Sequence, residues 1–185
     1  MGRLIYSAIT SLDGFVEDAQ GGFEWAAPDP EVHAFVNGLE RQIGANLYGR
    51  RMYETMAYWE SVNTNELSAE SREFQGIWRA AEKIVYSRTL QAPFSARTRI
   101  EREFDPTEVR QLKELSDRDI TIGGAGIAGQ ALAAQLVDEC QLFLTPVVVG
   151  AGKRALPANM QLRFTLLDER RFASGVVFLR YAVRA

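Results

Sequence analysis

The residues of this chain best suited to chemistry are four glycines between a short apolar run and a helical pattern. The run Ile120–Ile122 is followed by glycine at positions 123, 124, 126 and 129. A strand, a glycine turn and a helix start, in this order, point backbone N–H groups and the positive end of the helix dipole at one place, which suits a phosphate. Four glycines in seven residues exceed what a tight turn needs, so the sequence favours a phosphate site over a turn without a ligand.

The segment Gly124–Gly129 also fits the G-x-G-x-x-G fingerprint of dinucleotide-binding Rossmann folds, but its surroundings argue against that fold. A Rossmann unit carries an acidic residue about 20 residues further on, where it holds the ribose. The corresponding region, 142–149, contains no acid, and too little sequence follows the motif for a second Rossmann half. We therefore expect the glycine turn to belong to a different α/β fold.

A second predicted strand-to-helix turn carries two cations. Gly49 ends the short strand 45–49, and Arg50 and Arg51 begin the next helical segment. Positive charge is unfavourable at the N-terminal end of a helix dipole unless an anion lies between the two. The pair therefore favours an anion site over two solvated arginines.

Composition and charge exclude several classes of function. The 185 residues allow one domain, 1–185, with one core, and 46% hydrophobic and 24% charged residues are ordinary for a globular protein. A net charge of −3 argues against a nucleic-acid surface, and no apolar run approaches a membrane span. Cys140 is the only cysteine and His33 the only histidine, so we expect no disulfide, no metal site, no His-based triad and a cytoplasmic location, with Cys140 in the core.

Strands and helices mostly alternate along the chain and a hairpin follows them. The predicted strands are 3–10, 45–49, 83–90, 98–103, 119–122, 142–149, 162–168 and 176–183. Helices are predicted at 30–43 with Asp29 as N-cap, from residue 50 onward, within 63–80, at 107–116 with Thr107 as cap, and at 130–139. The segment before Pro30 is predicted to be a covering loop or a lid. This order predicts a three-layer α/β fold with a mixed, mostly parallel central sheet and a C-terminal antiparallel hairpin.

Five short motifs occur in an order that resembles the dihydrofolate reductase superfamily. They are Ser11–Gly14, Gly49–Arg51, Val85–Leu90, Ile122–Gly126 and Asp138–Glu139. In particular, the chain is similar to stand-alone proteins that resemble the C-terminal reductase domain of riboflavin biosynthesis, and the resemblance covers nearly the whole chain. It implies a dihydrofolate reductase-like fold and an NADPH-dependent reductase that transfers hydride to a pterin- or pyrimidine-like heterocycle.

The resemblance also implies where NADPH binds. The predicted cofactor-binding residues are Ala8, Ile9, Gly14, Phe15, Gly49, Arg50, Arg51, Ser87, Arg88, Gly123, Gly124, Ala125, Gly126 and Ile127. The arginine turns match those that hold the ribose 2′-phosphate and the pyrophosphate, and arginine is the natural bidentate partner of such groups. The glycines match the pyrophosphate turn, and the first strand with the loop after it matches the edge that meets the nicotinamide.

Carboxylates are the predicted catalytic residues. In dihydrofolate reductases a carboxylate early in the first helix binds the pterin, and the resemblance places Glu31 there, with Asp29 as the near alternative and a helix-start charge as the other explanation. Asp13, in the loop beside the nicotinamide edge, is the second predicted catalytic residue. Two other hypotheses remain, a non-catalytic NADP(H)-binding module and a structural homodimer without ligand; the late apolar strands favour a homodimer in every case.

Overall fold

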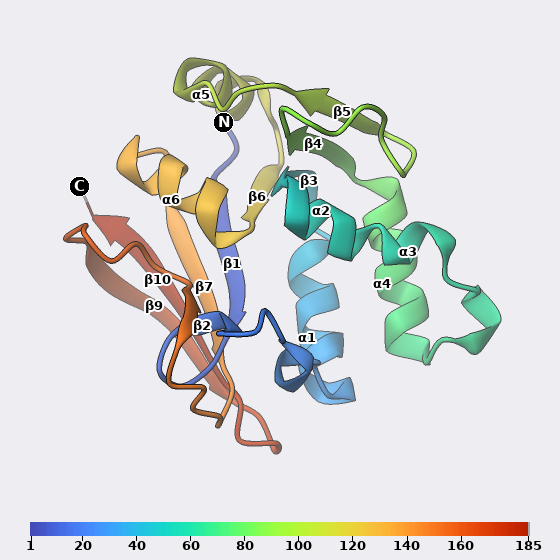
Figure 1. Ribbon diagram of the computed structural model, residues 1–185, viewed down its shortest axis with the longest axis vertical. Helices are drawn as coiled ribbons and strands as arrows, with labels where there is room; N and C mark the ends of the chain where they lie inside the picture. Colours follow the sequence, from blue (N-terminus) through green and yellow to red (C-terminus); the bar gives the residue numbers. More distant parts are fainter. Residues whose placement is uncertain (185) are drawn as a thin grey trace.

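The computed structural model describes residues 1–184, and its centre is a sheet of eight strands (Figure 1). The strand order is β5-β4-β3-β6-β1-β7-β10-β9. Every pair from β5 to β7 is parallel, whereas β10 pairs antiparallel with both β7 and β9. The strands are β1 Leu4–Thr10, β3 Ile43–Gly49, β4 Glu82–Tyr86, β5 Thr98–Glu101, β6 Asp119–Gly123, β7 Glu139–Leu144, β9 Arg163–Arg171 and β10 Val177–Arg184. This confirms the predicted mixed sheet with its C-terminal hairpin.

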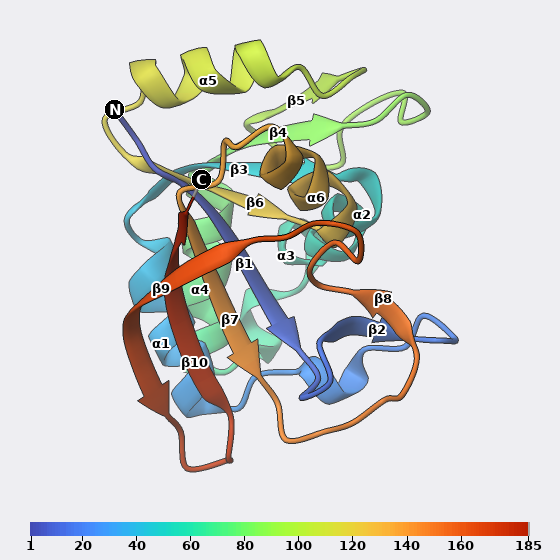
Figure 2. The same cartoon turned by 90° about the vertical axis from the view of Figure 1, so that its left-hand side faces the viewer.

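Helices cover both faces of the sheet and complete the predicted three layers. Figure 2 shows α1 and α4 behind the sheet and α6 in front of it. The first group is α1 Pro30–Glu40, α2 Arg50–Met56, α3 Tyr58–Ser61 and α4 Ala69–Ala80; the second is α5 Pro106–Leu115 and α6 Ala125–Ala133. Two 3₁₀ turns, η1 Glu24–Ala26 and η2 Thr64–Glu66, lie in the connections. No helix within residues 1–184 is long and apolar enough to cross a membrane.

The core has one apolar layer on each face of the sheet. Leu4 and Tyr6 of β1 pack with β6 and with α5 and α6, and Ile5 between them is buried too. On the other face, Trp78 and Phe143 belong to two clusters under α1 and α4. Because both faces of β1 are covered, its nearly continuous apolar sequence marks a central strand, as parallel sheets require. Cys140 is fully buried, which confirms it as a core residue.

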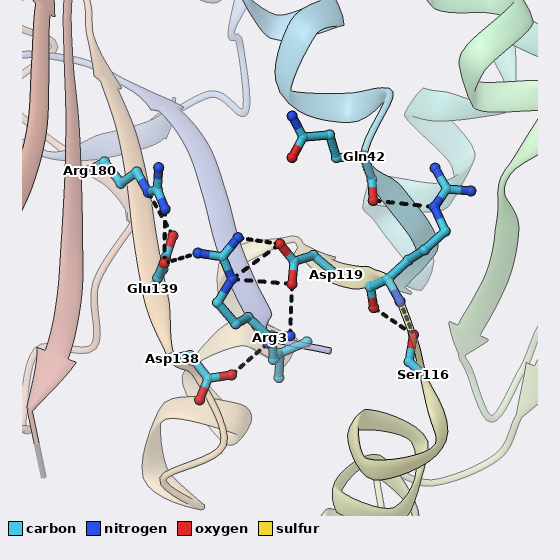
Figure 3. A network of polar contacts seen from close by, with 9 residues as sticks. Arg3, Gln42, Ser116, Asp119, Asp138, Glu139 and Arg180 are labelled. Atoms are coloured by element: carbon cyan, nitrogen blue, oxygen red, sulfur yellow. Dashed lines mark hydrogen bonds and ion pairs between the residues drawn. The ribbon is translucent and has the colours of Figure 1, made fainter. Parts of the chain in front are cut away.

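A network of charges fixes the register at the edge where the parallel strands begin (Figure 3). The backbone N–H of Arg3 donates to Asp119 over 2.9 Å, and its guanidinium donates to Glu139 over 2.6 Å. Arg180 of β10 donates to the other oxygen of Glu139 over 2.8 Å. The buried Glu139 carboxylate is therefore held between two arginines, which is the condition for a charge inside a protein. The charges at the beginning of the parallel strands therefore have a structural role. We look for the functional site at the other side, where these strands end.

The predicted end of the first helix was wrong. The first helix ends at Glu40, and Ile43, which was predicted to belong to its apolar face, begins β3. Gly44 does not end the helix; it lies at a register shift between β3 and β6, where a Cβ would come within 3.0 Å of Arg118. Glycine in a strand marks such an irregularity because close backbone approach excludes a side chain.

Other boundaries differ for similar local reasons. The cap of α5 is Asp105 rather than Thr107, because Pro106 occupies the first helical position and the Asp105 carboxylate accepts from the Thr107 N–H. The predicted helix 130–139 is instead α6, which begins inside the glycine run. The strand predicted at 142–149 is β7, which ends at Leu144, before Pro146.

Two larger features were not predicted from the sequence. The segment 63–80, expected to be a loop and a short helix, contains the twelve-residue α4, capped by Ser68. The expected loop before Pro30 contains β2, Phe15–Asp18, which pairs antiparallel with β8, Gly152–Arg154. This two-stranded ribbon lies outside the main sheet, at the ends of the parallel strands (Figure 2).

Candidate functional site

The two predicted arginine turns and the glycine turn lie at one edge of the sheet. They follow β3, β4 and β6, which are three adjacent parallel strands. The strands end level with one another, because Gly49 lies opposite Tyr86 and Tyr48 lies opposite Gly123. The carboxyl ends of parallel strands are where ligands bind in open α/β sheets.

Direct contacts join the three turns. A Cβ on Gly124 would lie 3.9 Å from the backbone nitrogen of Gly49, so the backbones after β3 and β6 nearly touch. Arg50 of the first turn donates to Thr89 Oγ1 of the second over 2.6 Å. The cradle, as we call residues 49–51, 87–89 and 123–127, is therefore one continuous surface.

Glycine is favoured at each of these positions of the cradle for a different physical reason. Gly124 has φ +99°, a conformation that side chains rarely adopt, and it starts α6. A Cβ on Gly123 would lie 3.0 Å from the Tyr48 ring, so this glycine serves core packing. Gly126 is exposed, and apart from its chain neighbours and the backbone of its own helix, no atom lies within 4 Å of the place its Cβ would occupy. Its neighbours in the fold therefore give no reason for glycine there, whereas a ligand resting on the helix end would.

The first turn of α6 presents unused hydrogen-bond donors. The first intrahelical bond is donated by Ala128 to the Gly124 carbonyl. The N–H groups of Ala125, Gly126 and Ile127 have no acceptor in the part of the chain that the structure describes. No acidic side chain lies in this turn. Free N–H groups together with the positive helix end are suited to an anion.

Three arginines surround the cradle, and two of them are largely free. Arg51 has 83% of its side chain exposed, and the nearest carboxylate oxygen, on Glu17, is 4.0 Å away. Arg88 is 78% exposed and meets the equally exposed Glu103 at 3.0 Å, a surface pair of little energetic weight. Arg50 is engaged by both Glu54 and Thr89. Arg51 and Arg88 can thus turn toward a phosphate, while Arg50 holds two turns together.

Ser87, Thr89 and Arg102 shape the turn after β4. Ser87 is buried, and its hydroxyl accepts from the N–H of Leu90 over 3.0 Å, so it organises its own turn. Arg102 donates to the carbonyls of Ser87 and Leu90, at 3.1 and 2.7 Å. Thr89 lay inside a recognised motif, but Arg102 follows a weakly predicted strand and gave no signal.

The predicted nicotinamide edge is the end of β1 and the loop after it. Ala8 packs on the α6 side of the sheet and Ile9 on the α1 side, so the two side chains lie on opposite faces of β1. Gly14 has φ +85° and open space around its Cβ position. Phe15 is buried and its N–H donates to Ser11 Oγ, which closes the loop.

Asp13 ties two loops of this edge together. Its carboxylate accepts from the N–H of Gly150 at 2.8 Å and of Val149 at 3.2 Å. The Ser11 hydroxyl and these two N–H groups hold the pKa of Asp13 below its ordinary value. The carboxylate therefore stays ionised at neutral pH and is suited to fixing the β1–β2 loop rather than to donating a proton.

Glu31 and Asp29 both contact the protein itself. Glu31 accepts from Arg170 over 3.2 Å and from the Ala173 N–H over 3.0 Å, so it joins α1 to the β9–β10 turn. Asp29 is the N-cap of α1 and accepts from the N–H groups of Glu31 and Val32. In the sheet order, strands β1, β7 and β10 lie between β9, which carries Arg170, and β6, the nearest strand of the cradle. Val32, next to Glu31, packs in the same cluster as Ile9 of the predicted nicotinamide edge.

The order of the sheet, its antiparallel hairpin and the glycine turn after β6 define a dihydrofolate reductase-like α/β protein. The family is shown directly by the sequence, since the RibD C-terminal domain matches residues 3–178. The chain belongs to the RibD C-terminal domain family. It is also 31% identical over 186 residues to the uncharacterized protein YyaP of Bacillus subtilis (strain 168), covering 97% of this chain and 94% of that protein.

Solved structures of low sequence identity share the fold. A pyrimidine reductase-like protein from Corynebacterium diphtheriae superposes with a TM-score of 0.70 at 16% identity, covering 100% of this chain and 92% of its own. RibD from Acinetobacter baumannii gives a TM-score of 0.74 at 19% identity, and the match covers all of this chain but 58% of RibD. These likenesses confirm the fold that the five motifs predicted.

Proposed function

We propose that this protein is an NADPH-dependent reductase of a pyrimidine- or pterin-like heterocycle. The observation that carries the proposal is the cradle, in which three adjacent turns join unused N–H groups to two free arginines at one sheet edge. Membership of the RibD C-terminal domain family supports a pyrimidine reductase-like function. The name of the Corynebacterium protein points to the same class of substrate.

The residues of the cradle fit NADPH by their chemistry. The N–H groups of Ala125, Gly126 and Ile127 would bind the pyrophosphate, and the space at Gly126 lets it approach the backbone. Arg51 and Arg88 would bind the ribose 2′-phosphate, because guanidinium groups pair with phosphate in a bidentate manner. When bound, this cofactor supplies a hydride from its nicotinamide ring. The protein's part is to place the ring along β1 and to hold the Asp13 loop beside it.

The alternative of a non-catalytic NADP(H)-binding module has one observation in its favour. Both predicted catalytic carboxylates, Asp13 and Glu31, are already hydrogen-bonded by the protein, so neither is free to exchange a proton in this conformation. We retain hydride transfer as the better proposal because positioning of the two reactants, and not an acid or base, is the main requirement of such a reaction.

Two titrations test the proposal. NADPH and NADH are added separately while the fluorescence of Trp25, Trp59 and Trp78 and the unfolding temperature are followed. NADPH is expected to bind at least about tenfold more tightly, since a charge-assisted pair with arginine is lost in NADH. Oxidation of NADPH is then measured over a panel of pyrimidines and pterins. Equal, weak responses to both nucleotides would contradict cofactor binding; tight NADPH binding with no turnover would support the non-catalytic module.

We also propose that the protein forms a homodimer through the edge strand β9. All but one of its nine residues are exposed, and Leu166 and Leu167, which lie at a β-bulge in the pairing with β10, are each 48% exposed. An open edge strand is a template for pairing with another chain. Sedimentation equilibrium should show a dimer that Leu167→Arg weakens; a wild-type protein that stays monomeric at high concentration would contradict this.

A further inference from the structure

A separate pocket of about 350 Å³ lies on the α6 face of the sheet, near the ends of β1 and β7. Its apolar walls are Leu142, Leu144, Leu156, Phe164 and Leu179. The volume is in the range of small-molecule sites, roughly 300–1,000 Å³. The pocket shares Thr10, Ser11, Leu12 and Gly14 with the end of β1 and the loop after it, the predicted nicotinamide edge, but none of its lining residues belongs to the cradle.

One cation lies at the rim of this pocket. The guanidinium carbon of Arg154 is 5.2 Å from the centroid of the Phe15 ring, which holds the side chain against the β2–β8 ribbon. Within residues 1–184, Arg154 has no ion pair and no side-chain hydrogen bond, and no Asp or Glu lines the pocket. Arg154 is exposed, so its charge faces solvent beside an apolar wall, and no carboxylate of the pocket compensates it.

Two hydroxyl groups add polar contacts without adding charge. Tyr181 and Thr10 line the pocket, and neither hydroxyl has a hydrogen-bond partner among the residues that the structure describes. The Tyr181 ring lies at 57° to Phe164, with the centroids 5.7 Å apart. The two rings thus provide a surface for a flat apolar group beside groups that can bind oxygen atoms.

We infer that this pocket is a second ligand site, distinct from the cofactor cradle, for a small apolar monoanion. The carboxylate of such a ligand meets Arg154, and its aromatic or aliphatic body covers the leucines and Tyr181. A neutral apolar ligand would cover Arg154 without compensating its charge, which is unfavourable. A dianion would place a second charge against an apolar wall that holds no other cation. A monoanion with an apolar body satisfies both conditions.

The test uses 2-naphthoate and its neutral analogue 2-naphthamide as probes of the whole protein. Isothermal titration should show saturable binding of 2-naphthoate, and at least about tenfold weaker binding of the amide, because a charge-assisted bond is lost. Arg154→Gln should remove this preference, and Leu156→Trp, which fills the pocket from a loop, should weaken both probes. Arg110→Gln removes an exposed cation on α5, outside the pocket, and should change neither.

Two further readouts place the ligand. Amide NMR signals of Thr10, Leu142 and Leu179 should shift with 2-naphthoate, and they should do so equally when NADPH is present. The inference is overturned if 2-naphthoate does not bind saturably, if Arg154→Gln keeps the preference for the acid, or if NADPH displaces the probe. It is also overturned if binding falls as the protein self-associates, since a second copy would then occupy the pocket. Binding of 2-naphthoate and its loss in Arg154→Gln are measured without NADPH, so failure of the cofactor proposal would leave these two outcomes unchanged.

Discussion

Arg50 donates a hydrogen bond to Thr89 Oγ1 over 2.6 Å, and this contact connects the turn after β3 to the turn after β4. The two residues are 39 positions apart in the sequence, and their strands are neighbours in the sheet. Because Arg50 is engaged in this way, the arginine pair that the sequence presents as one anion site divides into two roles. Arg50 fixes the cradle, and Arg51 next to it stays free.

Removing the free cations should change the choice of cofactor. Arg51→Gln and Arg88→Gln should each weaken NADPH binding by about tenfold and leave NADH nearly unchanged, since only NADPH carries the 2′-phosphate. Fluorescence titration of both nucleotides measures this, with Arg110→Gln as the matched control. If both variants bound NADPH as tightly as the wild type, the 2′-phosphate would have to bind elsewhere.

A negative charge introduced at Gly126 should weaken NADPH binding without lowering the stability of the protein. Gly126→Asp introduces an acid into the first turn of α6, which favours the helix by about 0.3–1 kcal/mol, and the space there is open. The same charge repels a pyrophosphate, so NADPH binding should fall by at least about tenfold while the unfolding temperature holds or rises. Gly126→Ala is the neutral control and should bind better than the aspartate variant. Unchanged binding by the aspartate variant would place the phosphates away from α6.

The contribution of Asp13 to stability should depend on pH in a defined direction. The pKa of Asp13 is lowered in the folded protein, so its carboxylate stabilises the fold above the ordinary value of 3.8. This stabilisation is lost as the pH falls below that value and through the folded pKa. Denaturation of the wild type and of Asp13→Asn should therefore differ most near neutral pH and converge in acid. A difference that does not change with pH would show that the charge of Asp13 is not involved.

Lys83 should give stability a pH dependence of the same direction, but in an alkaline range. Its side chain is buried, donates to the carbonyls of Trp78 and Ala81, and has a pKa lowered by burial to about 8. Between pH 8 and the ordinary value of 10.5 the unfolded chain binds more protons than the folded one, so stability contributed at this site rises with pH.

The matching variant is Lys83→Met, which keeps the apolar stem but cannot titrate. The free energy of unfolding of the wild type, measured against that of Lys83→Met, should increase from pH 8 to pH 10. The variant should be less stable throughout, because two buried carbonyls lose their donor. Parallel pH curves would mean that Lys83 keeps an ordinary pKa.

Much of the fold could be predicted because hydrophobic periodicity and turn residues are local signals. The apolar run of β1, the Asp29 cap before Pro30 and the glycine turn after β6 each fix an element from a few adjacent residues. Gly44 was misread because glycine ends helices and also marks strand irregularities, and only the neighbour across the sheet, Arg118, decides between the two.

The site was predictable in its backbone and less so in its side chains. Gly124 has a positive φ, and a glycine in the sequence is a local signal for such a conformation. The partner of Glu31, in contrast, is Arg170, which lies 139 positions away in the chain and could not be predicted locally. The ribbon of β2 and β8 joins segments equally distant from each other, so neither strand has a local signal strong enough to predict it. Long-range pairing thus decides which carboxylates are free for chemistry, and it is not encoded in spacing.

The most direct test of the central claim is the amide NMR spectrum of the protein as NADPH is added. We expect the signals of Ala125, Gly126 and Ile127 to shift first and most, together with the side-chain signals of Arg51 and Arg88, while those of β9 stay unchanged. NADPH-induced shifts that leave residues 125–127 unmoved, or no shifts at saturating NADPH, would contradict the cradle as the cofactor site.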